Sequence, residues 1–111
     1  MPEVVTTEFS NTYYGGAHAD HGVYCSGTTL RVEDGHIVME CENDTKRKHD
    51  LVLENYWSPP QEDHFVCGAE GAVQTNTGPI TVAAGKTITV RIPIPYLPFS
   101  PVAYCGANAG D

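Results

Sequence analysis

Residues 28–41 read Thr-Thr-Leu-Arg-Val-Glu-Asp-Gly-His-Ile-Val-Met-Glu-Cys, and this stretch decides the fold class. Asp34-Gly35 at its centre is the dipeptide favoured in a two-residue type I′ hairpin turn, because both turn positions need a positive φ. Apolar and polar residues alternate on both sides of the turn, as they do in strands with one buried face. The stretch therefore predicts an antiparallel β-hairpin.

The turn also fixes which residues of the two strands face one another. One face of the hairpin is then apolar, and the other carries charged residues with Val38 as its single apolar member. Turn chemistry and burial thus support the same register independently. The expected pairs are Glu33 with His36, Val32 with Ile37, Leu30 with Met39, and Thr28 with Cys41.

Similar patterns predict further short strands. A strand that reaches Ser58-Pro59-Pro60 must end there, because proline removes backbone donors. The prolines spaced through residues 93–101 predict an extended edge strand or strap. The other alternating segments are residues 4–9, residues 50–57, and a second hairpin made of residues 79–82 and 87–92 around a turn at residues 83–86.

Together these segments predict the architecture. About six or seven short strands, with turns every ~8–12 residues and no helical periodicity, are typical of an antiparallel sandwich or barrel. A chain of 111 residues and 12.0 kDa can form one domain with a modest core, but not two. We therefore expect a single all-β domain over residues 1–111, a small antiparallel β-sandwich stapled by two disulfides, with a compact β-barrel as the alternative. A flexible C-terminal tail should begin at about residue 107.

The four cysteines, Cys25, Cys41, Cys67 and Cys105, are spread widely along the chain. No two have the C-x-x-C spacing that zinc ribbons and redox motifs require. An even number of spread cysteines in a small chain instead predicts two disulfides in an oxidising, extracellular compartment. Four cysteines allow three pairings, and we favour Cys25–Cys41 with Cys67–Cys105 because Cys25 and Cys41 leave the first hairpin near each other.

The chain is acidic, with a formal net charge of -8. It offers no extended basic surface that could release counterions from phosphates, so we expect no nucleic-acid partner. The only basic run, residues 46–49, lies between Asp44 and Asp50, which partly cancel its field. No stretch reaches the ~20 apolar residues of a membrane span. No segment resembling a signal peptide follows Met1, so we expect a mature form with an added initiator Met.

His18, Asp20 and His21 form the densest polar cluster. Imidazole and carboxylate are groups that zinc and copper prefer, but the surrounding glycines oppose the helix that would place both rings on one face. Phosphate-binding glycine loops and calcium-loop patterns are absent as well. We therefore interpret the cluster as a solvated loop and predict neither a metal nor a cofactor.

A small secreted hydrolase is one alternative to a binding protein. Fungal ribonucleases of this size combine a carboxylate base, an arginine and a histidine acid on a disulfide-linked sheet. Glu54 and Arg91 could supply two of these roles, and His49 or His64 the third. No spacing fixes such a trio, and we interpret these residues, together with Glu62, as exposed surface charges.

Aromatic residues near the predicted strand ends are the candidate ligand-binding residues: Tyr13, Tyr14, Tyr56 and Trp57. Rings at such places can form a stacking platform for sugars or anchors for a protein partner. Because neighbouring residues of a strand face opposite sides, one of Tyr56 and Trp57 should belong to the core.

Asn43-Asp44-Thr45 is an N-glycosylation sequon in a predicted turn, where Asn43 would be exposed. With the disulfides, it favours a secreted, non-enzymatic binding protein of the effector, toxin or immunomodulatory kind, which recognises a host protein or a glycan through surface loops. A small secreted ribonuclease is the first alternative, and an intracellular or viral structural protein with free thiols is the second. The sequence contains no motif that selects a known family.

Overall fold

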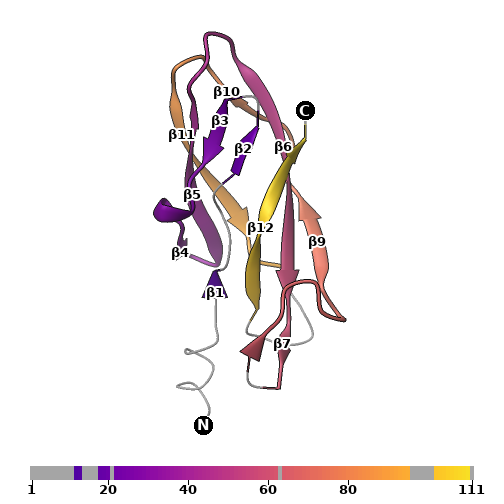
Figure 1. Cartoon of the computed structure of the whole chain (residues 1–111). Coiled ribbons are helices and arrows are strands. Elements are labelled where there is room, and N and C mark those ends of the chain that lie inside the picture. The colour runs from indigo at the N-terminus through magenta and orange to yellow at the C-terminus, as the bar shows by residue number, and fades with distance from the viewer. Residues whose placement is uncertain (1–11, 14–17, 21, 63, 96–101, 111) are drawn as a thin grey trace.

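A computed structural model describes residues 12–13, 18–20, 22–62, 64–95 and 102–110 of the chain. Within these residues, two β-sheets pack together around a shared core (Figure 1). This arrangement confirms the predicted all-β sandwich. The strand predicted at residues 4–9 and most of the proline segment lie outside the described residues.

The first layer, here called the β5 sheet, has the strand order β11-β5-β3-β2, and β4 also pairs with β5. Strand β5 is its centre because β11 occupies one edge of β5 while β3 and β4 share the other. The elements are β2 (His18–Asp20), β3 (Val23–Cys25), the 3-10 helix η1 (Gly27–Thr29), β4 (Arg31–Glu33), β5 (His36–Asn43) and β11 (Thr87–Pro93).

The β4–β5 hairpin confirms the predicted turn and the register next to it. Asp34 and Gly35 have φ values of 55° and 73°, so both lie in the left-handed region that a type I′ turn requires. Glu33 pairs with His36, as expected. The local turn chemistry was therefore sufficient to place this part of the chain.

Further from the turn the predicted register is wrong, because the chain leaves the strand and forms η1. The Thr29 hydroxyl accepts the backbone N–H of Glu40 at 2.9 Å, in place of a strand-to-strand bond. Strand β3 then pairs with the rest of β5, and Cys25 lies directly opposite Cys41. The predicted pairs that do not form are Leu30 with Met39 and Thr28 with Cys41.

Val38, the apolar residue predicted on the polar face, is fully buried there. Its cross-strand neighbours are Arg31 on β4 and Arg91 on β11. Both guanidinium groups bind the Glu33 carboxylate, at 2.5 Å and 3.3 Å. The aliphatic stems of long cationic side chains can cover an apolar neighbour while their charged ends remain in water, which explains a valine at this position.

The second layer, here called the β6 sheet, has the strand order β1-β12-β6-β10, and β9 also pairs with β6. Between β9 and β10 the chain stays attached to β6 at Thr77, whose N–H donates to Leu53 O and whose hydroxyl accepts from Leu53 N–H. The strands are β1 (Thr12–Tyr13), β6 (His49–Ser58), β9 (Val73–Asn76), β10 (Ile80–Val82) and β12 (Ala103–Gly110), and a small ribbon of β7 (Pro60–Gln61) and β8 (His64–Phe65) follows β6.

The second predicted hairpin has the right strands and the wrong pairing. The turn at residues 83–86 forms, but it carries the chain from one sheet to the other: β10 pairs with β6, and β11 pairs with β5. Val82 and Val90 consequently face the shared core from opposite layers. Alternation of apolar and polar residues indicates only that one face of each strand is buried. It therefore could not distinguish a hairpin within one sheet from a turn that joins the two sheets.

The C-terminal residues also differ from the prediction. A flexible tail was expected from about residue 107, whereas Ala107 and the residues up to Gly110 pair with β6 as part of β12. A bulge precedes this segment, and Gly106 adopts a φ of 100° within it. With this segment included, β12 pairs with β6 from Val52 to Ser58 and supplies hydrogen-bond partners to that part of the ten-residue strand.

Both predicted disulfides are present, Cys25–Cys41 and Cys67–Cys105, and no described cysteine is free. The first joins neighbouring strands and is buried in the core. The second ties the loop after β8 to β12, and Cys67 is exposed. Two disulfides indicate an oxidising environment and do not support the alternative of a protein with free thiols.

Candidate functional site

Strand β6 divides its side chains between the core and the outer surface of the β6 sheet. Leu51, Leu53 and Trp57 are buried on the inner side. Glu54 and Tyr56, which alternate with them, are half-buried on the outer side. The outer surface of β6 therefore presents a carboxylate and a phenol two residues apart.

Neighbouring strands extend this polar row. Asn108 on β12 lies opposite Glu54, and Gln74 on β9 lies opposite Tyr56. The fifth member is Asn76, which lies opposite Glu54 on the β9 side. We call these five residues the polar platform.

Hydrogen bonds join the platform residues in two groups. The Tyr56 hydroxyl donates to Glu54 Oε1 at 3.2 Å and accepts from Asn108 Nδ2 at 3.2 Å. On β9, Gln74 Nε2 donates to Asn76 Oδ1 at 2.7 Å. These contacts hold the polar groups in fixed positions before any ligand arrives.

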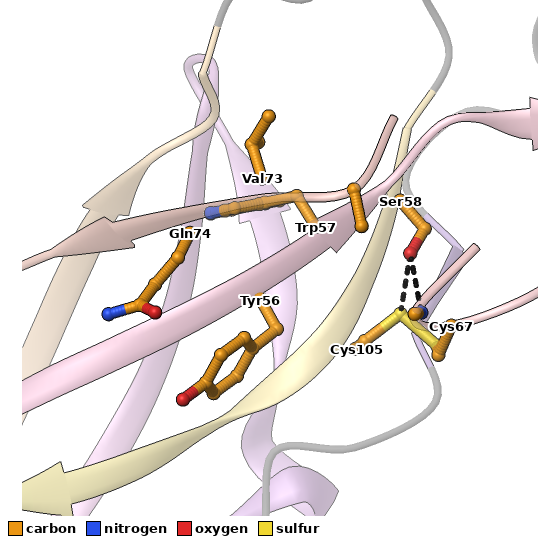
Figure 2. Close-up of a pocket in the computed structure, with 9 residues that line it drawn as sticks. Tyr56, Trp57, Ser58, Cys67, Val73, Gln74 and Cys105 are labelled. Atoms are coloured by element: carbon orange, nitrogen blue, oxygen red, sulfur yellow. Dashed lines mark hydrogen bonds between the residues drawn. A yellow bond between two sulfur atoms is a disulfide. The ribbon is translucent and has the colours of Figure 1, made fainter. Parts of the chain in front are cut away.

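A pocket of about 440 Å³ opens at the end of the platform (Figure 2). The Cys67–Cys105 disulfide and Ser58 form one wall, and Figure 2 shows Tyr56 and Gln74 pointing to the same side of their strands. The Ser58 hydroxyl accepts the Gly68 N–H at 3.2 Å and lies 3.6 Å from Cys105 Sγ. The disulfide loop is thus attached to the end of β6 beside the platform.

Trp57, a predicted binding residue, belongs to the core. Its side chain is 1% exposed, and its Nε1–H donates to Thr75 Oγ1 at 2.8 Å. Its ring packs on the ring of Tyr104, with 4.9 Å between the two ring centroids. Trp57 reaches the pocket only as part of its wall. Of the neighbouring pair, Tyr56 is the residue whose phenol lies on the surface, and the expectation that one ring would be buried is confirmed. Tyr14 and the side chain of Tyr13 lie outside the described residues.

Beneath the platform, the buried phenol of Tyr104 donates to Asn55 Oδ1 at 2.9 Å. Burial raises the pKa of Tyr104 well above the usual range of a tyrosine. This pair fixes β12 on β6 from the inside, directly under the strands that carry Asn108 and Tyr56.

The residues considered as a hydrolase site do not lie together in the structure. Glu54 lies on the outer face of the β6 sheet, whereas Arg91 is exposed on the outer face of the β5 sheet. Arg91 binds Glu33, and hydrogen bonds from Arg31 and Arg91 lower the pKa of the Glu33 carboxyl. His49 is buried at the start of β6, so its expected exposure is wrong, whereas His64 and Glu62 are exposed in or beside the β7–β8 ribbon.

Among the described side chains, no group of three or more His, Cys, Asp or Glu residues could hold a metal ion. The candidate ligands His18 and Asp20 lie on or beside β2, but their side chains, like the whole of His21, are outside the described part. None of the described helices is long and apolar enough to cross a membrane.

Asn43, predicted to be an exposed glycosylation site, is fully buried. Its Nδ2 donates to Arg47 O at 2.8 Å and to Val82 O at 2.9 Å, so both amide hydrogens are used. Its Oδ1 accepts from the N–H and the hydroxyl of Thr45. In the folded chain this asparagine connects two turns. The predicted exposure is wrong because Asn43 is the last residue of β5 rather than part of the turn, and its side chain bonds inward.

The platform contains residues that the sequence did not single out. Gln74 and Asn76 alternate on a short strand, and this period of two is the signal that could have indicated a polar sheet face. Asn108 fell in the segment expected to be a tail.

No family model matches the chain, and neither a curated protein nor a solved structure matches it.

Proposed function

We propose that this chain is a secreted, non-enzymatic binding protein that recognises a glycan through the polar platform and its adjoining pocket. The observation that carries the proposal is the connected row of Glu54, Tyr56 and Asn108 beside Gln74 and Asn76 on one exposed sheet face. The two disulfides support the secreted part, because such bonds persist in oxidising compartments outside the cytosol.

The chemistry of the platform suits sugars. Amide side chains both donate and accept hydrogen bonds, as sugar hydroxyls do. Within the described part of the chain, Gln74 Oε1 and Asn108 Oδ1 accept no hydrogen bond, and Asn76 Nδ2 donates none. These atoms can therefore bond a ligand without breaking an existing contact. The half-buried ring of Tyr56 adds an apolar face with a polar tip.

A glycan fits this surface better than a protein partner does. The centre of a protein interface is normally apolar and rich in aromatic residues. The exposed large apolar residues of the described chain are Tyr24 and Val66, and neither belongs to the platform. Preorganised polar groups also reduce the ordering cost of binding, which favours a small polar ligand.

The test is a screen of immobilised neutral oligosaccharides, followed by calorimetry with the tightest ligand. Tyr56→Ala should weaken that binding at least about tenfold, the effect of losing about 1.4 kcal/mol at a contact residue. Asn108→Ala should weaken it as well, because Asn108 both contacts the ligand and positions the Tyr56 hydroxyl.

Tyr24→Ala is the matched control, because it removes an exposed tyrosine from the β5 sheet. Melting temperatures of the three variants will show whether each remains folded. Failure of the protein to retain any oligosaccharide, or an equal loss in Tyr24→Ala and Tyr56→Ala, contradicts the proposal.

A further inference from the structure

Four of the six Lys and Arg residues lie in two turns at one end of the sandwich. The β5–β6 turn carries Lys46, Arg47 and Lys48, and the β10–β11 turn carries Lys86. Figure 1 shows these turns near each other at the top of the molecule. The other two cations, Arg31 and Arg91, are bound to Glu33 on the β5 sheet. We call the four turn residues the basic tip.

Asn43 holds the two turns together. Its side-chain amide donates to Arg47 O in one turn and to Val82 O at the start of the other. Its backbone N–H donates to Lys86 O at 2.9 Å. The cationic residues are therefore carried by backbone segments with fixed relative positions, which lowers the cost of ordering them around a ligand.

The cations of the tip are available for a ligand. All four are exposed, and within the described residues none of them takes part in an ion pair. Among the described side chains, the carboxylates nearest to them in the sequence are Asp44, Asp50 and Glu42, and Asp50 accepts a hydrogen bond from the Thr81 hydroxyl. The cations outnumber these neighbours, although the chain as a whole carries a net charge of -8.

The tip is also hollowed. A depression of about 530 Å³ is lined by Thr45, Lys46, Arg47 and His49. Lysine and arginine side chains at the rim of such a depression can surround an anionic group and donate several charge-assisted hydrogen bonds to it.

We propose that the basic tip binds a sulfated polysaccharide. Charge complementarity selects an anionic ligand. Clusters of lysine and arginine are a known pattern for binding heparin-like chains, and the disulfides indicate an oxidising environment. The anionic lipid surface that attracts basic segments belongs to the cytoplasmic leaflet. A wide nucleic-acid duplex would bring its dense charge against the acidic flanks of the molecule, whereas a single flexible chain can contact the tip alone.

This site goes beyond the proposed function and is separate from it. His49 begins β6 next to the tip, and Ser58 ends the strand next to the pocket. Ten residues of extended strand span ~30 Å, so one sugar unit cannot contact both places. The two proposals can therefore succeed or fail independently.

The experiment measures retention on immobilised heparin and affinity for soluble heparin at several salt concentrations. The wild-type chain should bind at about 50 mM salt and be released as salt rises, because counterion release drives such binding. Chemically desulfated heparin should bind at least about tenfold more weakly.

The matched variants each remove two positive charges. Lys46→Gln with Arg47→Gln should lower heparin affinity at least about tenfold and reduce the salt dependence. Arg31→Gln with Arg91→Gln, which lies outside the tip, should leave the affinity within about twofold. Tyr56→Ala should likewise keep heparin binding, which separates this site from the platform.

The inference is wrong if wild-type protein is not retained on heparin at low salt, or if both double variants lose affinity equally. It is also wrong if duplex DNA or anionic vesicles bind more tightly than heparin, since the partner would then belong to another class. Thermal melting of each variant shows whether its fold is intact.

Discussion

The side chain of Asn43 uses all of its amide hydrogens inside the protein. It connects the β5–β6 turn to the β10–β11 turn through Arg47 O and Val82 O, and it fixes Thr45 through Oδ1. Glycosylation at this sequon requires an accessible side-chain amide, whereas the folded chain buries the amide and uses both of its hydrogens. Glycosylation would replace an amide hydrogen that the fold already uses, so the structural role of this asparagine is the one that the folded chain supports.

Asn43→Ala should destabilise the protein by about 2–4 kcal/mol. The change removes the two hydrogen bonds that Asn43 donates to Arg47 O and Val82 O and the two that it accepts from Thr45, and each lost bond costs about 0.5–1.5 kcal/mol. Urea unfolding measures the difference. Asn76→Ala, which removes an exposed amide, should change stability by no more than ~0.5 kcal/mol. Equal losses in the two variants would contradict the role given to Asn43.

Among the elements, the strands could be predicted from the sequence more readily than their partners. Asp34-Gly35 determined its own hairpin because a type I′ turn leaves a single register for the adjacent residues. The turn at residues 83–86 carries no such restriction, and β10 and β11 join different sheets. Long-range pairing depends on which strand edges remain unpaired in the assembled fold, and that information is not local.

The candidate site was predictable in part for the same reason. Tyr56 could be recognised as an aromatic residue on a strand, and strand geometry required either Tyr56 or Trp57 to be buried. Gln74 and Asn108 become its neighbours only after β9 and β12 pair with opposite edges of β6. A platform shared by three strands therefore cannot be read from any one of them.

Strands β4 and β11, which both pair with β5, share an ionic contact that should make stability depend on pH. Hydrogen bonds from Arg31 and Arg91 lower the pKa of Glu33 below its ordinary value of 4.5. The unfolded chain therefore takes up this proton at higher pH than the folded chain does. The stabilisation is complete above pH 4.5 and is lost as the pH falls through the lowered pKa.

Glu33→Gln should consequently lower the melting temperature at neutral pH, and its difference from wild type should shrink below about pH 4.5. Melting followed by circular dichroism between pH 2 and pH 7 provides the measurement. Glu40→Gln, an exposed change on the neighbouring strand, is the control. A difference between Glu33→Gln and wild type that persists unchanged at the lowest pH would exclude the two arginines as its cause.

For the molecule as a whole, the two disulfides have different environments. Cys25 and Cys41 are 2% and 0% exposed and lie in the core between β3 and β5. Cys67 is exposed, and its bond to Cys105 forms the wall of the pocket. In the loop-entropy description, the two bonds contribute about 3 and about 4 kcal/mol, for separations of 16 and 38 residues. The two disulfides thus contribute similarly to stability, but a reductant should reach Cys67–Cys105 much more easily than Cys25–Cys41.

Native protein treated with a dithiol reductant should therefore lose Cys67–Cys105 first and accumulate a species with one intact disulfide. Attack on a disulfide requires the thiolate to reach a sulfur atom, and in the folded chain only the pocket-side bond is accessible. Alkylation followed by peptide mass spectrometry identifies which cysteines react. In strong denaturant both bonds should be reduced at similar rates, because burial no longer protects Cys25 and Cys41. Simultaneous loss of both disulfides from the native protein would mean that the sandwich opens globally before either bond is reached.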